Sequence, residues 1–227
     1  MNLHKAESTF NRKSILDCVK AAGLAVAIVA AALAIAAPAR ADAGDPSAVV
    51  QGLVNQALSV LRDNQMPLKQ KQDRLRAVVE QNFDFTEMSR SALGYHWRNL
   101  TPDQRADFTR LFTQFIENSY LSKISEYKGQ SVTFTKTVQL APGYTQVNSK
   151  VLPPNGGDPI SLDYALKFED GQWKVYDVTV DAISIIANYR NQFNRVINDR
   201  GFPTLMSDLR AKSSQLANSL GETTSDR

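Results

Sequence analysis

Apolar positions along the chain fall into three blocks that differ in spacing. From about residue 46 to residue 129 they recur every three or four residues, which is typical of helices with one buried face. Between residues 132 and 180 they alternate with polar residues, as in strands that bury one face. Helical spacing returns at Ile183. This order predicts an α+β domain, in which helices from both ends of the chain pack against a four-stranded antiparallel sheet.

Prolines, glycines and capping residues set the expected ends of these elements. Asp45-Pro46 and the capping box at 101–104 start helices, and Gly201 ends one. Short turns separate the strands, so neighbouring strands pair antiparallel. We expect helices over about 46–64, 68–82, 86–92, 102–129, 183–200 and 203–216, and strands over about 132–140, 144–152, 160–168 and 173–180.

The first 41 residues have the pattern of a secretory signal peptide. A segment with four basic residues precedes seventeen residues of Ala, Gly, Leu, Val and Ile only (21–37), and Ala39-Arg40-Ala41 offers a cleavage site. We expect cleavage after Ala41, export, a single domain over 42–217 and a polar tail over 218–227. A retained membrane anchor is the alternative, because about seventeen apolar residues are the lower limit for a span.

Charge and cysteine content change once this leader is set aside. The full chain has 26 basic and 23 acidic residues, a net charge of +3, but the leader holds five basic and two acidic ones. The remaining 21 of each sign form no basic stripe, which argues against binding of nucleic acid. The only cysteine, Cys18, also lies in the leader, so the exported chain has no disulfide and no thiolate ligand. These properties fit a bacterial periplasm.

Candidate catalytic groups are few. His96 is the only histidine after the leader, and no G-x-S-x-G motif occurs. A zinc site requires three or four ligands, and one histidine without any cysteine argues against such a site. We therefore expect no enzyme activity, no metal and no cofactor. The alternative is a cavity enzyme that uses His96 together with Asp177.

A twisted sheet that helices cover only in part leaves an apolar space on its concave side. Export and the scarcity of catalytic groups favour an apolar ligand in that space. Each side chain expected there is alternatively an ordinary core residue. The candidates for the pocket lining are Phe112, Phe115, Val147, Tyr164, Leu166, Trp173 and Tyr176.

Several segments, in this order, resemble one known family. They are 83–88 (FDFTEM), 92–97 (ALGYHW), 101–105 (TPDQR), 173–178 (WKVYDV) and 188–193 (NYRNQF). The chain is similar from about residue 47 to 212 to the MlaC family, also called the toluene-tolerance family, of periplasmic phospholipid carriers. One departure is Ala182, where the family usually has glycine.

The resemblance implies an NTF2-like or cystatin-like fold that holds acyl chains in an apolar pocket, with the head group near the mouth. It also implies two docking partners: an ABC-type lipid transport complex at the inner membrane and a lipoprotein–porin complex at the outer membrane. We expect a monomer that shuttles glycerophospholipid between them. A hopanoid-type carrier of the same family and a non-catalytic adaptor between the complexes are the alternatives. Candidates for contact with a head-group phosphate, chosen on charge alone, are Arg98, Lys150 and Arg190.

Overall fold

The structure is a computed structural model that describes residues 44–225. The expected leader and its cleavage site after Ala41 lie outside the described residues. Within this range, no helix combines the length and the apolar character that crossing a membrane requires.

Six α-helices, two short 3-10 helices and five strands make up the described chain. In chain order they are α2 (Pro46–Arg62), α3 (Leu68–Asn82), α4 (Phe85–Leu93), η1 (Gly94–Asn99), α5 (Pro102–Leu121), η2 (Ile124–Glu126), β1 (Ser131–Ala141), β2 (Tyr144–Leu152), β3 (Ile160–Glu169), β4 (Gln172–Val180), β5 (Ile183–Ser184), α6 (Ile185–Arg200) and α7 (Phe202–Ser225).

The strands form one antiparallel sheet in the order β1-β2-β3-β4-β5, so every strand pairs with its neighbour in sequence. The predicted α+β class is confirmed, but the prediction of four strands is wrong by one. The strand β5 was missed because helical spacing of the apolar residues begins at Ile183. In the structure Ile183 pairs with Val180. The turn between them places Asp181 at φ 44° and Ala182 at φ 67°, in the left-handed region.

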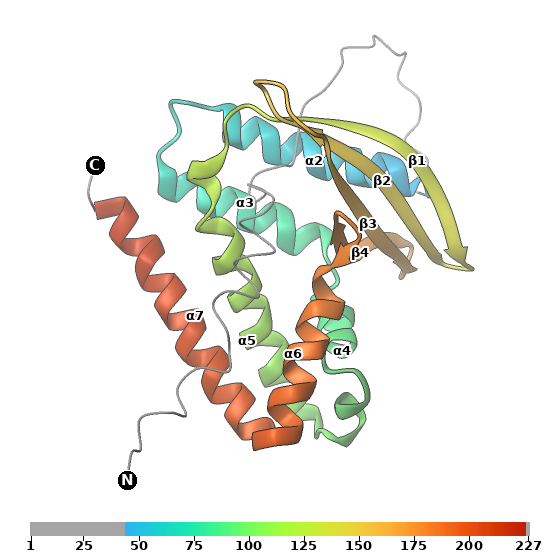
Figure 1. The fold of residues 1–227 in the computed structure, drawn as a ribbon, viewed down its shortest axis with the longest axis vertical. Helices are drawn as coiled ribbons and strands as arrows, with labels where there is room; N and C mark the ends of the chain where they lie inside the picture. The colour runs from blue at the N-terminus through green and yellow to red at the C-terminus, as the bar shows by residue number, and fades with distance from the viewer. Residues whose placement is uncertain (1–43, 226–227) are drawn as a thin grey trace.

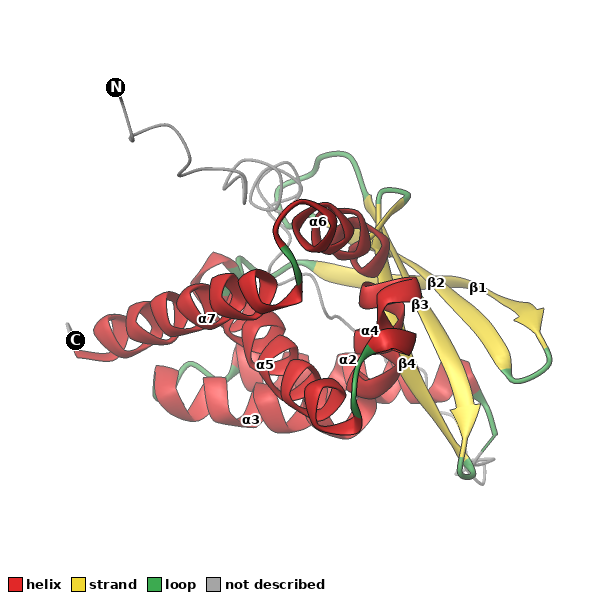
Figure 2. Ribbon diagram, turned by 90° about the horizontal axis from the view of Figure 1, so that it is seen from below, coloured by secondary structure: helices red, strands yellow, loops and turns green. Residues whose placement is uncertain are grey.

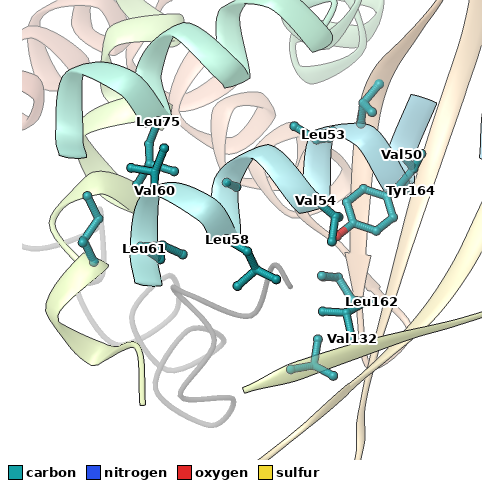
Figure 3. Packing of buried hydrophobic residues seen from close by; sticks show 14 of the residues in the cluster. Val50, Leu53, Val54, Leu58, Val60, Leu61, Leu75, Val132, Leu162 and Tyr164 are labelled. Carbon is teal, nitrogen blue, oxygen red and sulfur yellow. The ribbon is translucent and has the colours of Figure 1, made fainter. Parts of the chain in front are cut away.

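Helix α2 covers one face of the sheet and forms the first of two cores (Figures 1 and 3). The aromatic ring of Tyr164 on β3 lies against Val50, Leu53 and Val54 of α2 (Figure 3). All four are almost fully buried. Burying an aliphatic side chain contributes roughly 1.5–3 kcal/mol, so this contact holds the helix on the sheet. We call this cluster the sheet–α2 core.

Helices α4, α5, α6 and α7 form the second core, which lies beyond the sheet (Figures 1 and 2). Helix α5 packs against α7, and α4 packs against α6. Stacked and edge-on aromatic rings fill the centre; the Phe112 and Phe193 centroids, for example, lie 5.4 Å apart at 77°. Edge-on aromatic pairs of this kind add about 0.5–1.5 kcal/mol beyond burial. We call this cluster the helical core.

The corner between α3 and α4 joins the two cores. Phe83 packs against both, and it forms an isolated parallel bridge with Val175 of β4. The amide of Asp84 donates to the Val175 carbonyl at 2.8 Å. The Asp84 carboxylate then caps α4 by accepting from the amide of Glu87. The sheet therefore positions the start of the helical core.

Two helix ends differ from the sequence prediction. The helix expected over 102–129 ends at Leu121 and is followed by η2. Near its end the hydroxyls of Ser119 and Ser122 donate to backbone carbonyls within the preceding turn, which competes with continued helix. Helix α7 runs beyond the expected 216 to Ser225, and Leu220 is buried against the sheet–α2 core.

Candidate functional site

The candidate site is a cavity of about 1080 Å³, just above the ~300–1,000 Å³ range of small-molecule sites. It lies where the end of α2, the start of α3, the segment after α5 and the end of α7 meet. Its lining residues are Leu61, Arg62, Asn64, Met66, Leu68, Lys71, Gln72, Leu121, Ser122, Ile124, Ser125, Tyr127, Lys128, Gly129, Ser219 and Leu220.

The apolar part of the lining is continuous with the sheet–α2 core. Leu61, Leu121, Ile124 and Leu220 are buried members of that core. Met66, Leu68 and Tyr127 are partly buried and pack against it. The apolar side of the cavity is therefore the edge of a hydrophobic core, a surface against which an apolar chain packs favourably.

The turn between α2 and α3 shapes one side of the cavity. Asp63 ends α2, and its Oδ1 accepts from the amides of Gln65 and Met66 at 2.9 and 3.2 Å. Pro67, whose ring restricts φ, then precedes α3 as its N-cap residue. The reversal brings Lys71 of α3 back to the end of α2, where its Nζ donates to the carbonyl of Leu61 at 3.1 Å.

Three cations line the cavity together with the apolar wall. Besides Lys71, Arg62 donates from Nε to the Tyr127 hydroxyl at 3.4 Å, and Lys128 donates from Nζ to the Ser125 carbonyl at 3.5 Å. Lys71 is half-buried, whereas Arg62 and Lys128 are exposed. Among the described lining residues none is acidic. The cavity thus combines an apolar wall with positive charge.

The structure divides the seven residues predicted to line a pocket between the two cores. Phe112 and Phe115 lie in the helical core, and Val147, Tyr164 and Leu166 lie in the sheet–α2 core. None of the seven lines the cavity described above. Their contact with a ligand stays a prediction.

The other two predicted lining residues are half-buried aromatics on β4. Trp173 packs against Phe168 with ring centroids 5.1 Å apart, and its Nε1 donates to the Gly44 carbonyl at 2.8 Å. Tyr176 meets Tyr144 edge-on at 5.9 Å. Tyr176 falls at a β-bulge, because the register with β3 shifts between Ala165 and Leu166. The bulge turns Tyr176 toward the helical core.

The hydroxyl of Tyr164 is a buried polar group without a hydrogen-bond partner in the described part of the chain. Burial raises the pKa of this hydroxyl above its ordinary value, and the nearby Asp163 carboxylate raises it further. The group is therefore a neutral donor that the sheet–α2 core leaves unsatisfied.

The cations predicted to contact a head group lie away from the cavity. Arg190 donates from Nε to the Ser91 carbonyl at 2.7 Å, and its side chain lies next to Gly94. Arg98 is exposed on η1, and its carbonyl accepts from Arg105 at 3.3 Å. Lys150 is exposed on β2. Their role in head-group binding stays a prediction.

Sequence reasoning did not identify Arg62, Lys71 and Lys128. Arg62 and Lys71 lie on consecutive helices and Lys128 lies much further along the chain, and only the turn after α2 and the break after α5 bring them to one cavity. No local motif distinguishes them from ordinary solvated cations. The helix break at residues 119–122 is the signal that was available, because two serines occur there within one turn.

The family model described as MlaC protein matches residues 51–211. The chain belongs to the MlaC family. The resemblance seen in the sequence motifs is thereby confirmed, and it covers both cores of the fold as well as most of the cavity lining.

Two curated proteins of known name are similar to this MlaC-family chain. One is the intermembrane phospholipid transport system binding protein MlaC of Haemophilus influenzae, 23% identical over 177 residues, which cover 75% of this chain and 83% of that protein. The other is the toluene tolerance protein ttg2D of Pseudomonas putida, 28% identical over 161 residues, which cover 69% and 74%.

A solved structure has the same fold. It is the phospholipid-binding protein of Ralstonia solanacearum in complex with a phospholipid, with a TM-score of 0.67 and 26% sequence identity. The match covers 76% of this chain and 99% of that one. Part of the MlaC-family domain described here therefore corresponds to nearly the whole of a protein that was solved with a phospholipid bound.

None of these comparisons supports the alternative of a cavity enzyme. In this MlaC-family protein His96 Nε2 lies 2.9 Å from Asn194 Oδ1, while Asp177 accepts from the amides of Val178 and Ile186. Within residues 44–225 no hydrogen bond joins His96 to Asp177, and no group of three His, Cys, Asp or Glu residues has the arrangement of a metal site.

Proposed function

We propose that this MlaC-family protein is a periplasmic carrier that binds glycerophospholipid and moves it between membrane complexes. The observation that supports this proposal most directly is the cavity of about 1080 Å³ at the edge of the sheet–α2 core. The fold is shared with a protein that was solved in complex with a phospholipid. The acyl chains lie against the apolar wall formed by Leu61, Leu121 and Leu220, and the head group stays at the cationic side.

The energetics of a lipid in water require a carrier of this kind. Each methylene group transferred from hydrocarbon to water costs about 0.8 kcal/mol, so a chain of ~16 carbons faces on the order of 12 kcal/mol. An apolar cavity removes most of that cost. A carrier at equilibrium supplies no direction, so direction comes from the complexes at which it loads and unloads.

Location and partners follow from the leader and from the names of the relatives. The signal-peptide pattern over 1–41 supports export, and the Haemophilus influenzae relative is named as part of an intermembrane phospholipid transport system. We infer an ABC-type complex at the inner membrane and a lipoprotein–porin complex at the outer membrane as docking partners. A formally neutral exported chain suits this shuttle, because a basic one is retained at anionic surfaces by about 1 kcal/mol per cation.

The test is recovery and transfer of lipid. The exported protein is purified without detergent, extracted and analysed by mass spectrometry, and its transfer of labelled lipid between vesicles is measured. We expect co-purified glycerophospholipid and transfer above the spontaneous rate. A protein that is empty in every preparation and transfers nothing contradicts the proposal.

A bulky side chain at the cavity tests the location of the site. Ser125 is exposed and lines the cavity, so Ser125→Trp fills space there without disturbing a core. We expect a severalfold loss of bound lipid. The matched control is Ser207→Trp, at an exposed serine near the start of α7, which we expect to bind lipid as the parent does. Equal binding by both variants places the lipid elsewhere, for example among the predicted residues of the two cores.

A further inference from the structure

The charge of the cavity contrasts with that of the exported chain. After the leader the chain has 21 residues of each sign, yet the cavity lining has three cations and, among its described residues, no carboxylate. The carboxylates next to the lining residues have contacts of their own: Asp63 accepts from the amides of its own turn, and Glu126 pairs with Lys123 at 2.7 Å. The side chains that line the cavity therefore carry a net positive charge.

The contacts of the three cations leave donors available. The side chains of Arg62, Lys71 and Lys128 each donate one hydrogen bond, to the uncharged oxygen of Tyr127, Leu61 or Ser125 respectively. None of the three forms an ion pair with a residue in the described part of the chain. A guanidinium has five N–H donors and an ammonium three, so most of their donors remain unused by these contacts.

We propose that Arg62, Lys71 and Lys128 form the head-group subsite and that the protein selects phospholipids with a net negative head group over zwitterionic ones. This inference rests on the proposed function. The phosphate accepts from the half-buried Lys71 and from the Arg62 guanidinium, whose planar N–H groups suit phosphate oxygens. Lys128, which follows η2, lines the same cavity.

Selection between lipids depends on the group that is attached to the phosphate of the head group. The ammonium of phosphatidylethanolamine would lie among three cations, and within the described lining no carboxylate offsets that repulsion. The head group of phosphatidylglycerol ends in uncharged hydroxyls and retains the phosphate charge. The preference is electrostatic at a partly exposed site, so added salt weakens it.

The experiment compares loading from mixed vesicles. Lipid-free protein is incubated with vesicles of equal phosphatidylglycerol and phosphatidylethanolamine, of matched acyl chains, and the bound lipids are measured by mass spectrometry. We expect severalfold enrichment of phosphatidylglycerol in the protein. The combined variant Arg62→Gln, Lys71→Gln and Lys128→Gln is expected to bind both lipids in the vesicle ratio.

A control variant with the same loss of charge separates local contact from net charge. It combines Arg74→Gln, Lys136→Gln and Arg195→Gln, at exposed positions that do not line the cavity. We expect it to keep the preference of the parent. Loss of the preference in the control variant overturns the inference, because overall charge then explains the selection.

The remaining outcomes distinguish this inference from the proposed function. Binding of both lipids in the vesicle ratio by the parent protein overturns the subsite and leaves the carrier intact. Binding of neither lipid contradicts the carrier itself. The last experiment adds excess inorganic phosphate to the vesicle mixture. We expect the ratio of bound lipids to stay unchanged. Saturable binding of phosphate that excludes lipid would show that the cations bind free phosphate instead of a lipid head group.

Discussion

Arg76 Nε lies 3.2 Å from Glu117 Oε2 and so joins α3 to α5. The same guanidinium donates to Asn118 Oδ1 at 3.3 Å, and the Asn118 amide donates to the Ser213 carbonyl of α7 at 3.5 Å. These contacts tie together the three helices that contribute Gln72, Leu121 and Leu220 to the cavity. The junction lies about one helical turn from the lining on α3 and α5.

Among the residues that the structure describes, the carboxylate in this junction lacks a hydrogen bond at one of its two oxygens. Glu117 is buried, and its Oε1 has no hydrogen-bond partner in the described chain. Burial, with a further contribution from the neighbouring Glu80, raises the pKa of Glu117 to about 7 against the opposing effect of Arg76. The junction therefore changes charge near neutral pH.

The first prediction concerns the pH dependence of stability. Between pH 4.5, the ordinary pKa, and about 7, the folded protein holds a proton at Glu117 that the unfolded chain releases. Stability therefore falls as pH rises through this interval, by about 3 kcal/mol at most, and this contribution is constant above it. Urea unfolding across pH 4–8 measures the effect. Glu117→Gln stays neutral and is expected to flatten the curve; an unchanged slope in that variant contradicts the assignment.

The second prediction concerns the start of α6. Asp177 accepts from the amides of Val178 and Ile186 and from the Ser184 hydroxyl, so it anchors both β4 and the first turn of the helix. Burial raises the pKa of Asp177, while its hydrogen bonds with Ser184, Ile186 and Val178 oppose that shift. Asp177→Ala removes three acceptor contacts, and we expect a loss of about 2 kcal/mol in urea unfolding.

The matched variant at this position is Asp177→Asn. It keeps one carbonyl acceptor for the two amides and offers an N–H group to Ser184 Oγ, so a loss of about half that size is expected. Equal losses in the two variants would show that the carboxylate charge, rather than the acceptor geometry, stabilises the start of α6.

The third prediction follows from the backbone at Ala182, which adopts φ 67° in the turn between β4 and β5. A residue with a Cβ is strained there by roughly 1–2 kcal/mol, and glycine is not. Ala182→Gly is therefore expected to stabilise the protein by about 1 kcal/mol in thermal or urea unfolding. The same exchange at Ala211, an exposed position within α7, should cost about 1 kcal/mol. A loss at both positions contradicts the strained turn.

The fold was predictable where local chemistry decides structure. The capping box forms as its residues suggest: Thr101 Oγ1 accepts from the Gln104 amide at 3.2 Å, and Gln104 Oε1 accepts from the Thr101 amide at 2.9 Å. Turn residues and alternation likewise located the four long strands. In each case the information lies within a few residues of the feature.

The parts of the fold and of the site that the sequence did not predict depend on contacts between distant segments. In β4 the inward residues change phase, from Val175 to Val178, because Tyr176 is bulged. That three-residue interval is visible in the sequence, but only pairing with β3 distinguishes a bulge from an irregular strand. The cavity cations show the same limit more strongly, since Arg62 and Lys128 become neighbours of one space only after α2, α3 and η2 have packed.

The last prediction uses the unsatisfied hydroxyl of Tyr164. This group is buried between β3 and α2 and has no hydrogen-bond partner among the described residues. Its removal from water therefore destabilises the folded protein, because no hydrogen bond to those residues offsets the lost hydration. Tyr164→Phe keeps the ring against Val50 and Val54 and removes the hydroxyl, and we expect lipid-free protein to gain about 1 kcal/mol in urea unfolding. Tyr164→Leu also removes the ring and should lose roughly 2–4 kcal/mol. A loss in the Tyr164→Phe variant would show that the hydroxyl has a partner in the folded protein.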